Sequence, residues 1–219
     1  MANQPDLITL TDPVSPISEA YRTLRMNLQY AALDEQLDSL LITSSGPDEG
    51  KSTTLANLAV TMAQIERKVI MLDCDLRRPS LHELFGLRND LGLTDMMLDE
   101  QSMENPPLQE TGVDGLQLLA SGPLPPRPAD LLGSKRMGAV IAHLNESADM
   151  LLIDAPPVMV ATDALVLSAQ VDAVLIVISA GATKREQAQQ AVDRLNRVNA
   201  HILGSVLNNA VVTTGIRTY

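Results

Sequence analysis

The sequence predicts one α/β domain over residues 1–219, built on a mostly parallel β-sheet with helices on both faces. Short apolar runs alternate along the chain with longer amphipathic stretches, as strands and helices alternate in such folds. The first apolar run leads into a loop with the pattern of a phosphate-binding loop. Hydrophobic residues make up 45% of the chain, which is enough for one sizeable core and gives no sign of a second domain.

The amino-terminal part combines a proline-rich segment with a helical pattern. Its prolines predict an extended arm over residues 1–16. We expect a helix over residues 17–33, with Ser15 or Ser18 as its cap.

Three charged residues on this helix follow one another in steps of three. Glu19, Arg22 and Arg25 therefore lie on adjoining turns of one face. Taken by itself, this spacing favours a solvated charged face with a local ion pair.

The phosphate-binding pattern spans residues 44–53, directly after the apolar run at residues 40–42. Gly46 and Gly50 allow backbone N–H groups to curl around an anion at the start of the following helix. The strict pattern has a glycine at the position of Ser45, and in this chain the glycine comes one residue later. The loop predicts that the chain binds a nucleoside triphosphate.

The side chains of the loop suit this ligand. Lys51 can reach the β and γ phosphates, the Ser52 hydroxyl can ligate Mg²⁺, and Thr53 can contact the α phosphate. The expected nucleotide-binding residues of the loop are Gly46, Asp48, Glu49, Gly50, Lys51, Ser52 and Thr53.

Acidic residues follow two later apolar runs. Asp73 and Asp75 come at the end of the run at residues 69–72, and in extended backbone they point the same way. Two carboxylates beside a triphosphate repel each other unless a cation lies between them, which favours Mg²⁺. The alternative is that these two acids lie at the edge of a loop and have no functional role. Asp154 ends the run at residues 150–153 and is the second acid that such a protein needs to hold its metal.

The rest of the chain continues the alternation of strands and helices. We expect short helices and loops at 80–114, strands at 116–120, 173–178 and 202–207, a proline-rich turn at 121–128, helices at 135–145, 161–169 and 183–199, and a short tail at 210–219. With the phosphate-binding loop, this order predicts the fold of a P-loop NTPase.

Charge and composition exclude several kinds of partner. The net charge of -11 argues against nucleic acid and against direct adhesion to an anionic membrane. No secretion signal and no apolar run long enough to span a bilayer is visible. The single cysteine, Cys74, is interpreted as a small buried residue. With one cysteine the chain can form no internal disulfide, which is compatible with a reducing cytoplasm.

Taken together, the motifs resemble the bacterial tyrosine kinases (BY-kinases) of capsule and exopolysaccharide production, in their stand-alone cytoplasmic form. The likeness covers nearly the whole chain. It rests on residues 16–25, the loop at 45–53, residues 72–79, the turn containing 121–122 and 125–126, and residues 152–157.

The resemblance implies a reaction that moves the γ-phosphoryl group of MgATP to a protein tyrosine. It implies that Asp73 is the base that deprotonates the phenol, next to Lys51 and Asp75 in the catalytic group. Asp75 holds the metal through water, and Asp154 supports Mg²⁺ from the other side. Asn208 matches a residue that contacts adenine in related ATPases.

The resemblance also implies partners. In this family, the helix carrying Glu19, Arg22 and Arg25 builds a homo-oligomeric ring, which reverses the preference for a solvated face. The stand-alone members need the cytoplasmic segment of a membrane protein as activator, so we expect recruitment to the inner face of the membrane. Family members end in several tyrosines that neighbouring subunits phosphorylate, and here Tyr219 is the expected acceptor. Tyr21 and Tyr30, both on this helix, are interpreted as packing residues.

Two other classes remain open. A switch ATPase of the partitioning or septum-placement kind shares the sheet and the acids. Proteins of that kind resemble one another in carrying a second lysine in the phosphate-binding loop, at the position that Gly46 occupies in this chain. A nucleotide-binding scaffold without catalysis is the third class. Arg127 stands where an asparagine is commoner in the tyrosine kinases.

Overall fold

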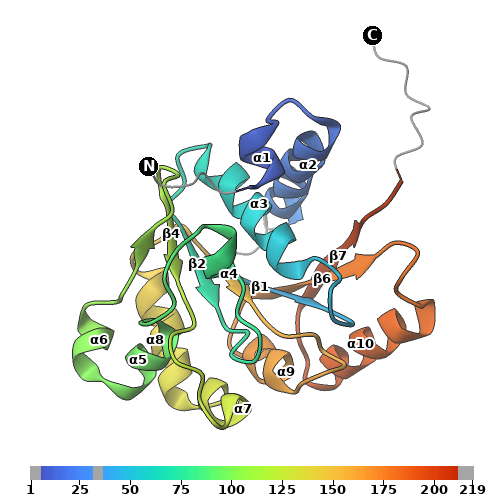
Figure 1. Cartoon of the computed structure of the whole chain (residues 1–219). Coiled ribbons are helices and arrows are strands. Elements are labelled where there is room, and N and C mark those ends of the chain that lie inside the picture. Colours follow the sequence, from blue (N-terminus) through green and yellow to red (C-terminus); the bar gives the residue numbers. More distant parts are fainter. Residues whose placement is uncertain (1–5, 32–36, 212–219) are drawn as a thin grey trace.

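The computed structural model describes residues 6–31 and 37–211. Within these residues, seven strands form one sheet in the order β3-β4-β2-β5-β1-β6-β7. All neighbouring strands are parallel except β3 and β4. Helices cover both faces of the sheet (Figure 1), so the predicted α/β class and fold are confirmed.

The strands at the centre of the sheet are buried along their whole length. Every residue of β1, β2 and β5 is buried, as expected for parallel strands that are covered on both faces. The strands are β1 (Ser39–Ser44), β2 (Val69–Asp73), β3 (Gln109–Glu110), β4 (Leu116–Leu119), β5 (Met150–Asp154), β6 (Ala173–Ser179) and β7 (Ile202–Asn208).

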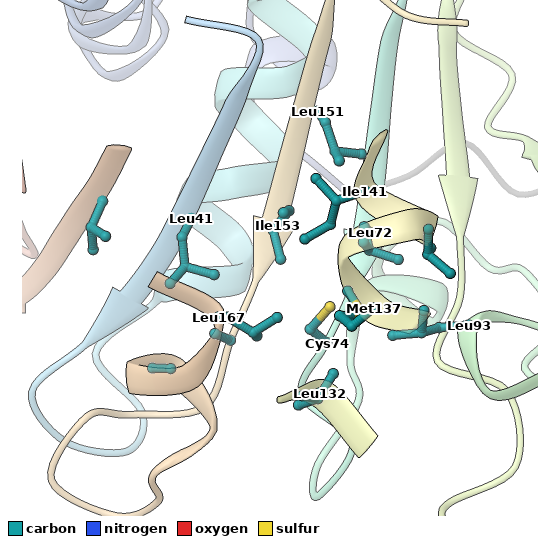
Figure 2. Packing of buried hydrophobic residues seen from close by; sticks show 14 of the residues in the cluster. Leu41, Leu72, Cys74, Leu93, Leu132, Met137, Ile141, Leu151, Ile153 and Leu167 are labelled. Atoms are coloured by element: carbon teal, nitrogen blue, oxygen red, sulfur yellow. The ribbon is translucent and has the colours of Figure 1, made fainter. Parts of the chain in front are cut away.

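The helices form two layers. On one face, α1, α2 and α4 pack around α3. On the other face, α5, α7, α8, α9 and α10 enclose a second core (Figure 2). The bounds are α1 (Ile8–Thr11), α2 (Pro16–Ala31), α3 (Lys51–Ala63), α4 (Leu81–Leu84), α5 (Leu93–Leu98), α6 (Glu100–Glu104), α7 (Pro128–Leu132), α8 (Lys135–Asn145), α9 (Asp163–Ser168) and α10 (Arg185–Arg197).

The alternation of side chains along β2 decides which of its residues face the phosphate-binding loop. Leu72 and Cys74 point into the core shown in Figure 2, whereas Met71 packs in the core around α3. Asp73 therefore lies on the α3 side of the sheet. Cys74 is fully buried, as predicted.

The amino-terminal segment differs from its prediction. The expected extended arm is wrong for the described residues, because α1 is helical and Leu7 is buried against the α3 core. Thr9 donates from its N–H (3.1 Å) and its hydroxyl (2.9 Å) to the Asn57 side chain on α3. Proline spacing cannot reveal this contact, since a four-residue helix has almost no periodic pattern of its own.

The following helix, α2, begins one residue earlier than predicted, at Pro16, because proline suits the first turn of a helix. The Ser15 hydroxyl accepts the Ser18 N–H at 3.2 Å and is therefore the cap. Tyr30 does not pack: its side chain is 65% exposed.

Besides α1, two further short elements were not predicted as helix or strand, namely α7 and β3. Residues 32–33 of the expected first helix and the proposed acceptor Tyr219 lie outside the described residues. Across residues 6–31 and 37–211, no helix combines the length and the hydropathy that crossing a bilayer requires.

Candidate functional site

The sheet order brings the phosphate-binding loop and both acidic strands together. β5 lies between β1 and β2, and Asp73 at the end of β2 is the register partner of Asp154 at the end of β5. The loop that leaves β1 after Ser44 therefore starts beside these two acids. This is the carboxyl edge of the sheet, where ligands bind in open α/β folds.

The loop has the backbone shape of an anion-binding site. Asp48 (φ 57°) and Gly50 (φ 85°) adopt left-handed conformations, and α3 starts at Lys51 without a side-chain cap. Its first N–H groups are thus available to an anion at the positive end of the helix. The positive φ of Gly50 favours glycine, and a Cβ at this position would also displace the Asn208 side-chain nitrogen, which would lie only 2.1 Å from it.

Glu49 faces the protein interior and not the anion. Its carboxylate accepts the Ser45 N–H at 2.9 Å, the Ser45 hydroxyl and the Thr183 hydroxyl, and the residue is only 5% exposed. Ser45 stands where the strict pattern has a glycine, and its hydrogen bonds to Glu49 stabilise the shape of the loop. Glu49 was predicted to bind nucleotide. Because its carboxylate is turned away from the anion site, only its backbone is placed to contact the nucleotide.

Asn208 lies at the back of the loop. Its side-chain nitrogen donates to the Glu49 carbonyl oxygen at 3.0 Å, so the end of β7 supports the turn before Gly50.

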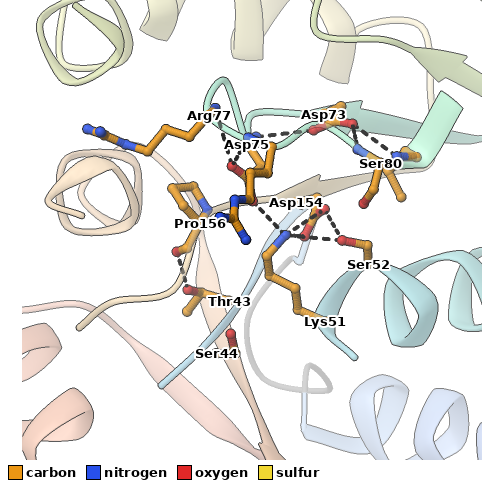
Figure 3. Close-up of polar contacts among 12 residues, drawn as sticks. Thr43, Ser44, Lys51, Ser52, Asp73, Asp75, Arg77, Ser80, Asp154 and Pro156 are labelled. Carbon is orange, nitrogen blue, oxygen red and sulfur yellow. Dashed lines mark hydrogen bonds and ion pairs between the residues drawn. The ribbon is translucent and has the colours of Figure 1, made fainter. Parts of the chain in front are cut away.

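Lys51 lies between two carboxylates (Figure 3). Its Nζ is 2.9 Å from Asp75 Oδ2 and 3.1 Å from Asp154 Oδ2. The Ser52 hydroxyl donates to the same Asp154 oxygen at 2.5 Å. The structure thus unites Lys51, Ser52, Asp75 and Asp154, as the sequence predicted.

The charges in this cluster do not balance. Burial by itself lowers the pKa of Lys51, but the nearby charges of Asp154 and Asp75 raise that pKa above its usual value, so the ammonium stays charged. Burial also raises the pKa of Asp154, while the Lys51 ammonium opposes this shift. One ammonium faces two carboxylates, and the excess negative charge favours a further cation.

Asp73 and Asp75 have different surroundings although they are two residues apart. Asp75 lines the cavity next to the loop. The fully buried Asp73 carboxylate points towards Ser80 (Figure 3) and accepts the N–H groups of Asp75, Ser80 and Leu81, each at 3.1 Å. Burial, assisted by the charge of Asp154, raises the pKa of Asp73 to about 8.

A cavity of about 620 Å³ lies over the loop, within the usual size range of ligand sites. Asp75 and all the predicted loop residues except Gly46 line it, together with residues to which the sequence assigned no role. Arg78 and Glu83 are the charged ones among these, and Arg78 follows Asp75 in the motif that carries the family resemblance. The unassigned lining residues are Pro47, Arg78, Pro79, Ser80, Glu83, Leu84 and Pro157.

The site fits Mg²⁺ held jointly by protein and phosphate. Ser52, Asp75 and Asp154 offer the oxygen ligands that this ion prefers, and the Lys51 ammonium between the two acids shows that the position accepts a cation. In the described part of the chain, no cluster of three or more His, Cys, Asp or Glu side chains is arranged to hold a metal. The remaining ligands must come from phosphate and water, as is usual for Mg²⁺.

The three charged residues of α2 do not all stay on one solvated face. Arg22 pairs with Glu19 at 3.0 Å, which agrees with the local ion pair expected from their spacing. Arg25 instead donates to the Thr61 carbonyl oxygen on α3 at 2.6 Å. Thus Arg25 joins α2 to α3 within one chain.

Comparison with known proteins gives close relatives over nearly the full chain. A ParA family model, described as a NUBPL iron-transfer P-loop NTPase, matches residues 38–216. Tyrosine-protein kinase YwqD of Bacillus subtilis is 43% identical over 205 residues, covering 94% of this chain and 86% of YwqD. The putative tyrosine-protein kinase CapB of Staphylococcus aureus is 35% identical, covering 90% of this chain and 86% of CapB.

Tyrosine-protein kinase etk of Escherichia coli is a longer relative. It is 30% identical over 93% of this chain, which spans only 28% of the length of etk.

Solved structures show the same arrangement. The kinase domain of Escherichia coli ETK superimposes with a TM-score of 0.91 at 29% identity, covering all of this chain and 85% of that one. The chimeric protein CapA2B2 gives 0.87 at 34% identity, covering 94% and 91%. The cell division ATPase MinD of Pyrococcus furiosus gives 0.66 at 26% identity, covering 78% and 71%.

The buried position of Lys51 generates a first prediction. Lys51→Met leaves Asp75 and Asp154 buried without their cation, so the free energy of unfolding should fall by about 3 kcal/mol at pH 7. ADP affinity should fall at least about tenfold, because a charge-assisted contact to phosphate is lost. Urea unfolding and calorimetry measure the two effects. Lys68→Met, which replaces an exposed lysine directly before β2, is the control, and equal stability of the two variants would contradict the assignment.

The raised pKa of Asp73 generates a second prediction. Between about pH 4 and pH 8 the folded protein retains a proton that the unfolded chain has released, so stability should fall as the pH rises through this window. The slope should reach up to about 1.4 kcal/mol per pH unit in EDTA, and Asp73→Asn should flatten it. Urea unfolding at several pH values tests this. The exposed control Asp90→Asn should keep the wild-type slope, and the same slope in Asp73→Asn would refute the idea.

Proposed function

The chain belongs to the family of bacterial tyrosine kinases, and on this premise we propose that it transfers the γ-phosphoryl group of ATP to tyrosines of neighbouring copies of itself. The observation that carries the proposal is the buried group of Lys51, Asp75 and Asp154 beside a phosphate-binding loop. The family resemblance extends the proposal to the control of capsule or exopolysaccharide production.

Each residue of the site has a role in this reaction. The loop N–H groups and Thr53 bind the phosphates, and Lys51 moves from the acids to the β and γ oxygens. Ser52, Asp75 and Asp154 would hold the metal. Bound Mg²⁺ neutralises the charge that develops on the phosphate oxygens.

We assign the role of base to Asp73. The bond from the γ phosphorus to the bridging oxygen breaks, the bond to the phenolic oxygen forms, and the phenol proton passes to Asp73. A pKa of about 8 suits a base that works near neutral pH. Ser80 both lines the cavity and donates to Asp73, so the base lies directly behind the cavity wall at this residue.

Asn208 is proposed to contact the adenine ring. Its link to the Glu49 carbonyl oxygen supports this role, since a base held there would lie next to the phosphate-binding loop.

We propose Tyr219 as the acceptor, because it is the only tyrosine after Tyr30 in the sequence. Val211, the last described residue before it, is 89% exposed, which supports a tail that can reach a neighbouring subunit. Tyr30 is also exposed but lies within α2, where backbone hydrogen bonds restrict its entry into another active site.

The assembly is proposed to be a ring in which the α2 face of one subunit contacts the next. The exposed Glu19 and the exposed apolar residues Ile17 and Met26 on the same helix support an intermolecular role. The cytoplasmic segment of a membrane protein is proposed as activator. In support, this chain matches only 28% of etk, so some relatives carry further sequence joined to the kinase part. Such a partner would bring the chain to the inner face of the membrane.

The kinase proposal predicts labelling of tyrosine. Incubation of the full chain with MgATP at high protein concentration should give phosphotyrosine, mapped by mass spectrometry to Tyr219. Tyr219→Phe should remove most of the label, while the matched control Tyr30→Phe should retain it. Asp73→Asn should bind ADP like the wild type but transfer at least about 100-fold more slowly, because it lacks the base.

Two outcomes would contradict the kinase proposal. Release of phosphate without labelled tyrosine would identify a switch ATPase. Nucleotide binding with neither reaction, also after addition of the cytoplasmic activator segment, would identify a scaffold.

The ring proposal predicts a change in molar mass. Replacement of Glu19 and Arg22 by alanine should lower the mass measured by light scattering to that of a monomer. Unfolding should change little, because the partly exposed pair contributes little to stability. Arg88→Ala, which removes an exposed ion pair elsewhere, is the control. A large assembly in the double variant would rule out this interface.

A further inference from the structure

The two neighbouring arginines after Asp75 have different environments. Arg78 lines the cavity. Arg77 instead forms two parallel hydrogen bonds with Asp163, from Nε to Oδ2 and from Nη2 to Oδ1, each 2.9 Å long. Asp163 is fully buried, lies 86 residues further along the chain and does not line the cavity. A bidentate pair of this kind restricts both the distance and the orientation of the guanidinium.

The backbone of the same segment orients Asp75. The N–H groups of Arg77 (3.3 Å) and Arg78 (3.0 Å) both donate to Asp75 Oδ1. The other oxygen, Oδ2, is thereby left to face Lys51 at 2.9 Å. The position of the segment 75–78 therefore decides which carboxylate oxygen is presented to the cation site.

Asp163 is well placed to anchor this segment. It is the first residue of α9, whose Ala164 and Leu167 are buried in the core. The loop before α9 is held by hydrogen bonds from the Val158 N–H to the Ser44 carbonyl oxygen (2.8 Å) and from the Met159 N–H to that of Ser45. The anchor is thus joined to the base of the phosphate-binding loop.

We propose that Asp163 is a positioning residue, which acts through Arg77 to hold segment 75–78 so that Asp75 presents one oxygen to the metal. The inference rests on the proposed role of Asp75 in holding Mg²⁺. Residues that orient a metal ligand typically change metal affinity 10- to 100-fold when they are replaced. An acid in the first turn of a helix can also act merely by favouring the helix, and such a role predicts no change in metal affinity.

The test measures binding of ADP at increasing Mg²⁺ concentrations by calorimetry. Asp163→Asn keeps the size of the side chain but loses its charge and one of the two oxygens that accept hydrogen bonds from Arg77. Arg77→Lys keeps the positive charge but cannot form the two parallel hydrogen bonds. Each should raise the Mg²⁺ concentration needed for half-maximal tightening of ADP by about tenfold. ADP affinity without Mg²⁺ should stay within about twofold, since the phosphate-binding loop is intact.

The control is Asp90→Asn, which breaks a bidentate pair of the same shape with Arg88 in an exposed position. It should leave the Mg²⁺ dependence unchanged. Arg77 is partly exposed, so Arg77→Lys keeps the proposal testable if Asp163→Asn fails to fold.

A double-mutant cycle identifies the route of the effect. If Asp163 acts through Arg77, then Asp163→Asn should cause no further loss in an Arg77→Met background. Additive losses, or a wild-type Mg²⁺ dependence in both single variants, would overturn the proposal. Failure of the wild type to label tyrosine would count against the kinase function alone, because the Mg²⁺ shift is measured without phosphoryl transfer.

Discussion

The charge balance around Lys51 is the constraint on which the rest of the site depends. Asp75 and Asp154 are almost completely buried, and the Lys51 ammonium is their shared counter-charge. An uncompensated charge in such a place costs several kcal/mol. In the proposed reaction, Lys51 would therefore leave the acids for a phosphate when another cation takes its place. This requirement would couple binding of the nucleotide to binding of the metal.

The sheet makes this cluster possible because two acids end adjacent strands in the same register. Asp73 and Asp154 lie opposite each other and would repel each other strongly if both were ionised. The surroundings of Asp73 limit this repulsion. Three backbone N–H groups hold Asp73, and burial keeps its pKa near 8. A carboxyl that changes its proton near neutral pH is useful next to a phenol, whereas one that binds a metal must remain ionised.

Sequence reasoning succeeded where the signal is local. Lys51, Ser52 and the three aspartates follow apolar runs, and parallel strands must bring such ends to one edge of the sheet. It failed where a contact depends on packing between distant segments. The inward turn of Glu49, the pair between Arg77 and Asp163, and the bond from Arg25 to α3 leave no periodic trace in the sequence. The helix α1 was missed because four residues between prolines carry too weak a pattern.

The shared sheet does not distinguish a tyrosine kinase from a switch ATPase, since MinD has the same architecture. The difference lies in side chains at the phosphate-binding edge. A Cβ at Gly46 would come too close only to the end of the flexible Gln187 side chain, at 2.6 Å, since Glu49 Oε1 would lie at an ordinary contact distance of 3.5 Å, and Gly46 does not have a positive φ. Packing therefore does not force a glycine here, and a lysine could be accommodated once Gln187 moves. The position that carries a second lysine in switch ATPases thus adds no charge in this chain. In the proposed reaction, neutralisation of the phosphates would then depend on Lys51, the metal and the cavity-lining Arg78, and both residues belong to the same subunit as the proposed base.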